Sequence, residues 1–161
     1  MMSGVSITLL DGSDPLTEDL AERHAAEWGY LYTNWDGAKA LAEFRPQKTD
    51  GSLPATLVLR EEEQVAGSVS LLYGDCEACT NLDPWLGSLY VFPEFRGRGH
   101  AGRLIEAAIR FAETAGEKEL HVFTESAGDL FRRHGFKTLE RTMLHGKPIE
   151  ILRCELPQIA G

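Results

Sequence analysis

The sequence has few cysteines and no long apolar run. Its 161 residues include only Cys76, Cys79 and Cys154, which are too few and too unevenly placed for a disulfide framework. No apolar stretch approaches the length of a membrane span, and residues 1–4 have neither the basic nor the apolar segment of a signal peptide. We therefore expect a cytoplasmic protein with no membrane partner.

Basic residues are also scarce. The chain has 16 Lys and Arg residues against 25 Asp and Glu residues, which gives a formal net charge of −9. This balance argues against nucleic acid as a partner and favours a cationic one, such as an amine. The hydrophobic content of 43% is ordinary for a globular chain. We expect one domain over residues 1–161, as a monomer or a homodimer.

The pattern of apolar residues predicts a mixed α/β chain. The expected strands cover residues 5–10, 53–60, 65–73, 89–92, 120–124, 136–144 and 149–156. One expected helix begins at Thr17, and three others cover residues 38–44, 101–115 and 129–134. The order is β-α-α-β-β-β-α-β-α-β-β, with a polar loop at 74–84. Cys76-x-x-Cys79 in this loop lacks a second pair or a nearby His, so no metal site is predicted.

The strongest functional signal is a turn rich in Gly and Arg between a strand and a helix. The turn, residues 96–102, follows Val91-Phe92-Pro93. Its glycines let the backbone bend and approach a ligand, and the first N–H groups of the helix favour an anion. Phosphate is the anion that this arrangement suits best. Arg96 and Arg98 are expected to contact it, whereas for Arg103 and Arg110 a solvated surface position is an equal alternative.

Two known spacings overlap in this turn. Gly97-x-Gly99-x-x-Gly102 matches the dinucleotide fingerprint, but it lies two-thirds along a short chain and follows a hairpin, which argues against an NAD site. Arg96-x-x-Gly99-x-Ala101, after Val91-x-Pro93, resembles the acyl-CoA loop of the GNAT (Gcn5-related) N-acetyltransferase family. A later segment, Phe131 to Gly135-Phe136, resembles the aromatic-x-x-x-Gly-Phe ending of the same family. The resemblance extends over about residues 53–156.

The resemblance implies a GNAT fold, which is a mixed, mostly antiparallel central sheet flanked by helices. It also implies an acyltransferase that uses acetyl-CoA to acetylate a primary amine of a small molecule or of a peptide or protein N-terminus. The pyrophosphate would lie on the turn, and the pantetheine arm along the fourth strand, whose N–H groups would hold the oxyanion. The implied cofactor-binding residues are Leu89, Tyr90, Val91, Arg96, Gly97, Arg98, Gly99, His100, Ala101 and Gly102.

The sequence departs from the family pattern at the residue that usually donates a proton. The family often has a Tyr four residues before the Gly-Phe pair, where this chain has Phe131, so the usual general acid is absent. Thr124 and Ser126 are candidate donors or local caps, and Asp83 is a candidate base acting through water or a turn residue. His121 fits a core or surface position better than a role as base, and His24 and His100 are weaker candidates for the base.

Two tyrosines lie in the region that follows the first expected helix. Tyr30 and Tyr32 are candidate substrate-binding residues or core residues, because the family places this region over the acceptor pocket. The absence of the usual Tyr at Phe131 leaves open a non-catalytic module that binds or senses acyl-CoA. A dinucleotide oxidoreductase is a third possibility.

Overall fold

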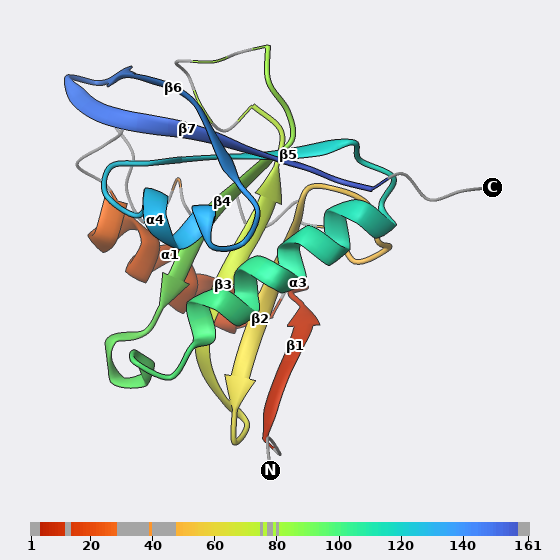
Figure 1. The fold of residues 1–161 in the computed structure, drawn as a ribbon. Coiled ribbons are helices and arrows are strands. Elements are labelled where there is room, and N and C mark those ends of the chain that lie inside the picture. Colours follow the sequence, from red (N-terminus) through yellow and green to blue (C-terminus); the bar gives the residue numbers. More distant parts are fainter. Residues whose placement is uncertain are drawn as a thin grey trace.

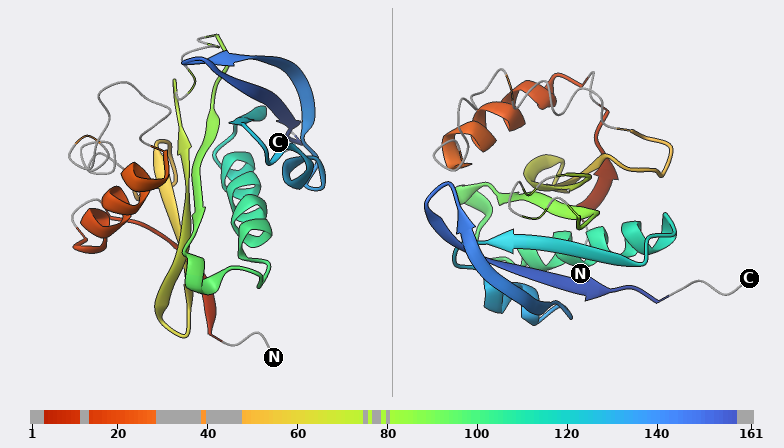
Figure 2. Two further views of the ribbon diagram at one scale, coloured as in Figure 1. Left: turned by 90° about the vertical axis from the view of Figure 1, so that its left-hand side faces the viewer. Right: turned by 90° about the horizontal axis from the view of Figure 1, so that it is seen from above.

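A seven-stranded sheet with helices on both faces forms the body of the molecule (Figures 1 and 2). The computed structural model describes residues 4–11, 14–28, 39, 48–74, 76, 79 and 81–157. The mixed α/β class predicted from the sequence is confirmed. The elements are β1 (Val5–Leu9), α1 (Leu16–Trp28), β2 (Ala55–Glu61), β3 (Gln64–Leu72), β4 (Trp85–Val91), η2 (Pro93–Phe95), α3 (His100–Thr114), β5 (Glu119–Thr124), α4 (Gly128–Arg132), β6 (Lys137–Leu144) and β7 (Lys147–Glu155).

Most element boundaries lie close to those expected. The helix expected over 38–44 falls outside the described residues apart from Lys39. The strand expected over 89–92 is wrong at its start, because β4 begins at Trp85. Gly87 and Ser88 interrupt the apolar pattern there, and both residue types are poor strand formers by propensity.

The strand order is β1-β2-β3-β4-β5-β7-β6, and the only parallel pair in the described sheet is β4 with β5. These two strands are in register at one position, Trp85 opposite His121. Figure 1 shows β4 starting beside β5 and then running away from it. Beyond Trp85, the edge of β4 that faces β5 therefore has no strand partner in the described part of the sheet.

A bulge bends β4 where the two strands diverge. Ser70 pairs with Gly87 and Ser68 with Tyr90, so the two residues Ser88 and Leu89 oppose one residue of β3. Ser88 has φ of 54°, in the left-handed region. Such a bulge increases the local twist and re-aims the side chains that follow it. After it, Leu89 packs on the α3 side of the sheet and Tyr90 on the α1 side.

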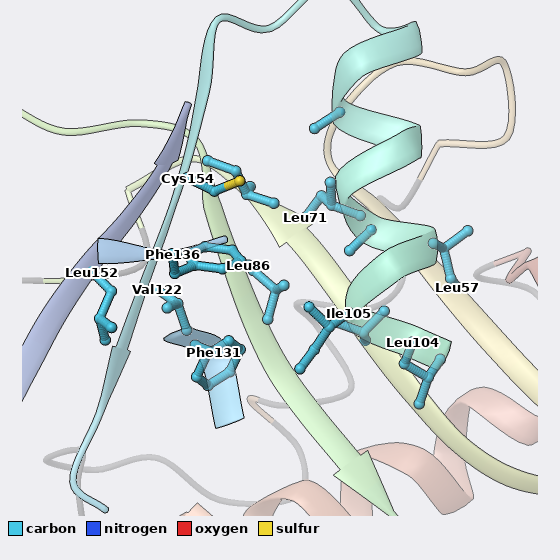
Figure 3. Close-up of a cluster of buried hydrophobic side chains, with 14 of the residues drawn as sticks. Leu57, Leu71, Leu86, Leu104, Ile105, Val122, Phe131, Phe136, Leu152 and Cys154 are labelled. Atoms are coloured by element: carbon cyan, nitrogen blue, oxygen red, sulfur yellow. The ribbon is translucent and has the colours of Figure 1, made fainter. Parts of the chain in front are cut away.

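The main core lies between the sheet and α3 (Figure 3). Residues 104, 105, 108 and 112 of α3 are fully buried at helical spacing. They pack with side chains of β2, β3 and β4 and also with Leu120, Val122 and Leu152 beyond the divergence. Helix α3 therefore holds the two parts of the sheet together, and α1 covers the opposite face (Figure 2).

Gly67 leaves no room for a side chain between β3 and β4, and its replacement tests this packing. A Cβ at this position would lie 2.5 Å from the Tyr90 carbonyl oxygen and 3.3 Å from Leu104 Cδ1. We expect Gly67→Ala to lower the free energy of unfolding by about 1–3 kcal/mol, as overpacked cores do. Urea denaturation gives the value. Gln64→Ala, at the exposed start of the same strand, should change it by less than about 0.5 kcal/mol, and an equal loss in both variants would contradict the packing argument.

Candidate active site

The start of α3 presents unoccupied backbone donors. Gly97 and Gly99 have φ of 80° and 81°, which favours glycine at both positions, and Gly99 is the N-cap with no side-chain cap bond. The Arg96 N–H donates to the Pro93 carbonyl at 3.3 Å, and the Arg103 N–H donates to the Gly99 carbonyl at 3.2 Å. By helix geometry, the N–H groups of residues 100–102 point out of the helix. They form a site suited to an anion.

The arginines of this turn bond to the chain itself. Arg96 Nε donates to the Val91 carbonyl at 2.8 Å, and its guanidinium lies 5.5 Å from the ring centre of Tyr90. Arg98 forms an ion pair with Glu61, and Arg103 Nη1 donates to the Arg98 carbonyl at 2.6 Å. These bonds fix the turn against the ends of β2 and β4. Ligand contact by Arg96 and Arg98 stays a prediction.

The diverging edge of β4 continues from this turn. It carries the residues predicted to bind the cofactor, with Leu89 and Val91 on the α3 side and Tyr90 on the α1 side. Backbone N–H and C=O groups along a strand edge without a strand partner can pair with an extended ligand. The structure therefore brings the predicted strand and turn residues together as one continuous surface.

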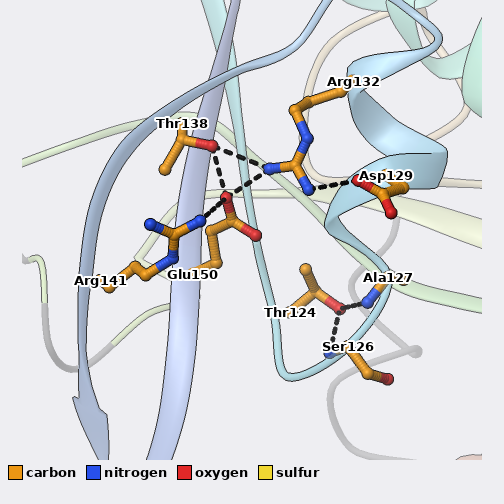
Figure 4. Close-up of polar contacts among 8 residues, drawn as sticks. All are labelled: Thr124, Ser126, Ala127, Asp129, Arg132, Thr138, Arg141 and Glu150. Carbon is orange, nitrogen blue, oxygen red and sulfur yellow. Dashed lines mark hydrogen bonds and ion pairs between the residues drawn. The ribbon is translucent and has the colours of Figure 1, made fainter.

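The candidate proton donors lie at the end of β5, before α4 (Figure 4). Thr124 Oγ1 accepts from the Ser126 N–H at 3.4 Å and from the Ala127 N–H at 3.0 Å, so it closes the turn that leads to α4. Neither bond uses the hydroxyl proton of Thr124. Ser126 is exposed.

Asp83 lies just before the start of β4, at the end of this strand opposite to the Gly-Arg turn. Its Oδ1 accepts from the Gly74 N–H at 2.6 Å and so closes the loop between β3 and β4. The other two predicted residues, Tyr30 and Tyr32, lie outside the described residues. The carboxylate of Asp83 therefore has a structural role in this loop, and its role as a base stays a prediction.

Phe131 belongs to the core. It is 3% exposed and meets the Phe136 ring edge-to-face at 5.5 Å between centres. The position where the family often has a Tyr is thus filled here by an apolar ring with no proton to give.

Two histidines on the α1 side of the sheet are buried. His24 of α1 lies 3.4 Å from Ser68 Oγ and contacts Tyr90 edge-to-face, and burial lowers its pKa to about 3. His121 has its Nδ1 3.1 Å from the Pro84 carbonyl, and burial lowers the pKa of this ring too. Both rings are therefore neutral near pH 7.

A carboxylate that the sequence analysis missed fixes α4. Glu150 of β7 accepts from Arg132 and Thr138, and Arg141 Nη2 lies 3.5 Å from its Oε2 (Figure 4). The hydrogen bond from Thr138 and the ion pair with Arg132 hold the pKa of Glu150 below its usual value. Arg132 also pairs with Asp129 at 2.6 Å. No periodic pattern links residues on α4 with residues on a later hairpin, so only the fold reveals this cluster.

The cysteines of the 74–84 loop are packed under the last hairpin. Cys76 and Cys79 are buried with Trp85, Ile149 and Ile151. Cys79 Sγ lies 3.2 Å from Glu140 Oε1, and burial raises the pKa of this thiol to about 11. Among the described residues no group of three or more His, Cys, Asp or Glu side chains is arranged to hold a metal ion, and no helix is long and apolar enough to cross a membrane.

The chain is similar to known acetyltransferases in both sequence pattern and fold. A family model described as an acetyltransferase (GNAT) domain matches residues 53–138. An N-acetyltransferase from Staphylococcus aureus superimposes with a TM-score of 0.73 at 18% identity over 96% of this chain and 100% of that one. The protein yncA from Salmonella typhimurium, solved with its cofactor acetyl-CoA, gives 0.71 at 18% identity over 99% and 98%. NAA60 from Arabidopsis thaliana, in complex with a bisubstrate analogue, gives 0.67 at 12% identity over 96% and 99%. No curated protein matches the sequence.

The low pKa of His24 makes stability depend on pH. Below its ordinary pKa of 6.5 the unfolded chain binds a proton at His24 that the folded chain does not bind until about pH 3, so stability falls as the pH drops through this window. Between pH 7 and pH 5 this residue should contribute a loss of about 2 kcal/mol. His24→Gln should remove that part of the pH dependence in urea unfolding. An identical pH dependence in the variant and the wild type would contradict the assignment.

Proposed function

Because the chain belongs to the GNAT acetyltransferase family, we propose that it is an acetyl-CoA-dependent N-acetyltransferase that acts on a primary amine. The observation that carries the proposal is the uncapped start of α3 beside the edge of β4 that has no strand partner in the described sheet. These two features form one surface that suits an anion at one end and an extended chain at the other. The bound acetyl-CoA of yncA, a structural neighbour, supports the choice of donor.

The donor would lie along this surface. The backbone N–H groups of residues 97–102 would receive the pyrophosphate, since the Arg96 N–H already donates to the Pro93 carbonyl. Each hydrogen bond to a charged oxygen contributes about 1.5–3 kcal/mol. The pantetheine arm would pair with the backbone of Leu89, Tyr90 and Val91. The bulge at Ser88 turns the strand where the thioester would lie, so that its N–H groups can face the carbonyl oxygen.

The reaction needs two proton transfers. The neutral amine attacks the thioester carbon, the C–N bond forms, and the C–S bond breaks to release CoA thiolate. We assign the proton of the amine to Asp83 through water. We assign protonation of the thiolate to the Thr124 hydroxyl, with Ser126 as the exposed alternative beside it. Because an ordinary thiol has a pKa of about 8.5, the thiolate is a tolerable leaving group without the usual Tyr.

The acceptor would carry a primary amine, on a small molecule or at a peptide or protein N-terminus. The net charge of −9 favours a cationic molecule, and the helix on the acceptor side, α1, exposes Glu18, Asp19, Glu22 and Glu27. Tyr30 and Tyr32 follow this helix in the chain and would form part of the acceptor wall.

A panel of amines with a thiol-release assay tests the proposal. We expect acetyl-CoA to bind and free CoA to appear with at least one amine. The panel should include amino acids, small polyamines and peptides with free N-termini. Tight binding of acetyl-CoA with no turnover on any amine would instead support the non-catalytic acyl-CoA module that Phe131 favours. Binding of NAD(H) that acetyl-CoA does not displace would support a dinucleotide site.

The glycines at the two ends of α3 allow a matched test of the donor site. Gly99 and Gly116 have φ of 81° and 86°, so a Val is strained equally at both. Gly99→Val should weaken acetyl-CoA binding at least about 100-fold, because it distorts the turn that supplies several charge-assisted hydrogen bonds. Gly116→Val should leave the affinity within about twofold, since no contact with the donor is lost. Titration calorimetry measures both, and equal losses would contradict the assignment of the turn.

A further inference from the structure

Glu61, the last residue of β2, holds the Gly-Arg turn in place. Its Oε2 forms the ion pair with Arg98 Nη1, and its Oε1 lies 3.4 Å from His100 Nε2. Both partners belong to the turn predicted to bind the cofactor. One carboxylate therefore reaches the residue before Gly99 and the residue after it.

The imidazole of His100 is oriented by a second contact. Its side chain is 1% exposed, and its Nδ1 lies 3.1 Å from Arg103 Nη1. Because a guanidinium only donates, Nδ1 accepts and the ring proton is on Nε2, facing Glu61. The Nε2–H makes no aligned hydrogen bond, so its approach to the carboxylate is an electrostatic contact in a buried place. Neutralising or removing Glu61 would leave this N–H without its negative neighbour.

Arg103 closes the same network through the backbone. Its Nη1 donates to the Arg98 carbonyl and also to His100, so Arg98 is held at both its side chain and its main chain. The network joins the end of β2 to the first turn of α3 around the glycine at φ 81°. The positions of the N–H groups of residues 100–102 therefore depend on Glu61.

We propose that Glu61 is a positioning residue for the cofactor: its carboxylate fixes Arg98 and His100 so that the backbone N–H groups of the turn converge on the pyrophosphate. The inference rests on the proposed function. Through its charge alone, a carboxylate near an anion site would weaken binding of the anion. As a positioning residue, Glu61 would instead strengthen binding of acetyl-CoA. The sign of the effect therefore separates the two roles.

The test compares Glu61→Ala and Glu61→Gln with Glu63→Gln, which removes the same charge from the exposed turn between β2 and β3. We expect Glu61→Ala to weaken acetyl-CoA binding about tenfold, the effect of one lost charge-assisted contact, and Glu61→Gln to weaken it less. Glu63→Gln should stay within about twofold of the wild type. Unchanged or tighter binding in the Glu61 variants would overturn the proposal.

A truncated donor distinguishes positioning of the turn from a general loss of structure. Acetylpantetheine carries the thioester but lacks the pyrophosphate and the nucleotide. We expect Glu61→Ala to lower kcat/KM for acetyl-CoA while leaving that for acetylpantetheine within about twofold of the wild type. An equal fall for both donors would mean that Glu61 serves only stability, which would also appear as a lower Tm. A wild-type protein that binds no acetyl-CoA would refute the proposed function itself, which is a different outcome.

Discussion

The pairing of β4 with β5 at a single position is the constraint on which the rest of the structure depends. Because the strands touch at Trp85 and His121 and then separate, β4 keeps a free edge within the described sheet. A free edge inside a domain needs support from elsewhere, and α3 supplies it by packing its buried face against strands on both sides of the divergence. The same helix begins where β4 ends, so its N–H groups and the strand edge meet at one place.

Two carboxylates stabilise the elements beside this edge. Glu61 gathers Arg98 and His100 at the start of α3, and Glu150 gathers Arg132, Arg141 and Thr138 beside α4. In both networks residues of different elements meet across long stretches of chain, 37 residues in the case of Glu61 and Arg98. The arginines of the turn bond to the chain itself, and the backbone N–H groups at the start of the helix suit an anion. An acidic protein can present such a site because the start of a helix supplies a local partial positive charge.

The family and the cofactor turn were predictable from the sequence because both depend on local features. The spacing Arg96-x-x-Gly99-x-Ala101 describes consecutive residues, and the buried face of α3 follows its helical period. The bulge at Ser88 was not predictable, because it depends on how β3 pairs with β4. Glu61 was left outside the strand expected over 53–60, and its contacts were not predictable because its partners are distant in sequence. Thr124 was weighed as a donor or a cap, and the structure shows the capping bonds while the donor role stays a proposal.

The central proposal is that the start of α3 and the edge of β4 without a strand partner together bind acetyl-CoA. Backbone amide chemical shifts followed by NMR during an acetyl-CoA titration test it most directly, because they report on the N–H groups themselves. We expect the largest chemical-shift changes at the amides of residues 96–102 and of Leu89, Tyr90 and Val91. The amides at the far end of α3, near Gly116, should shift little. Saturable binding that shifts other amides and leaves these two segments unchanged would contradict it.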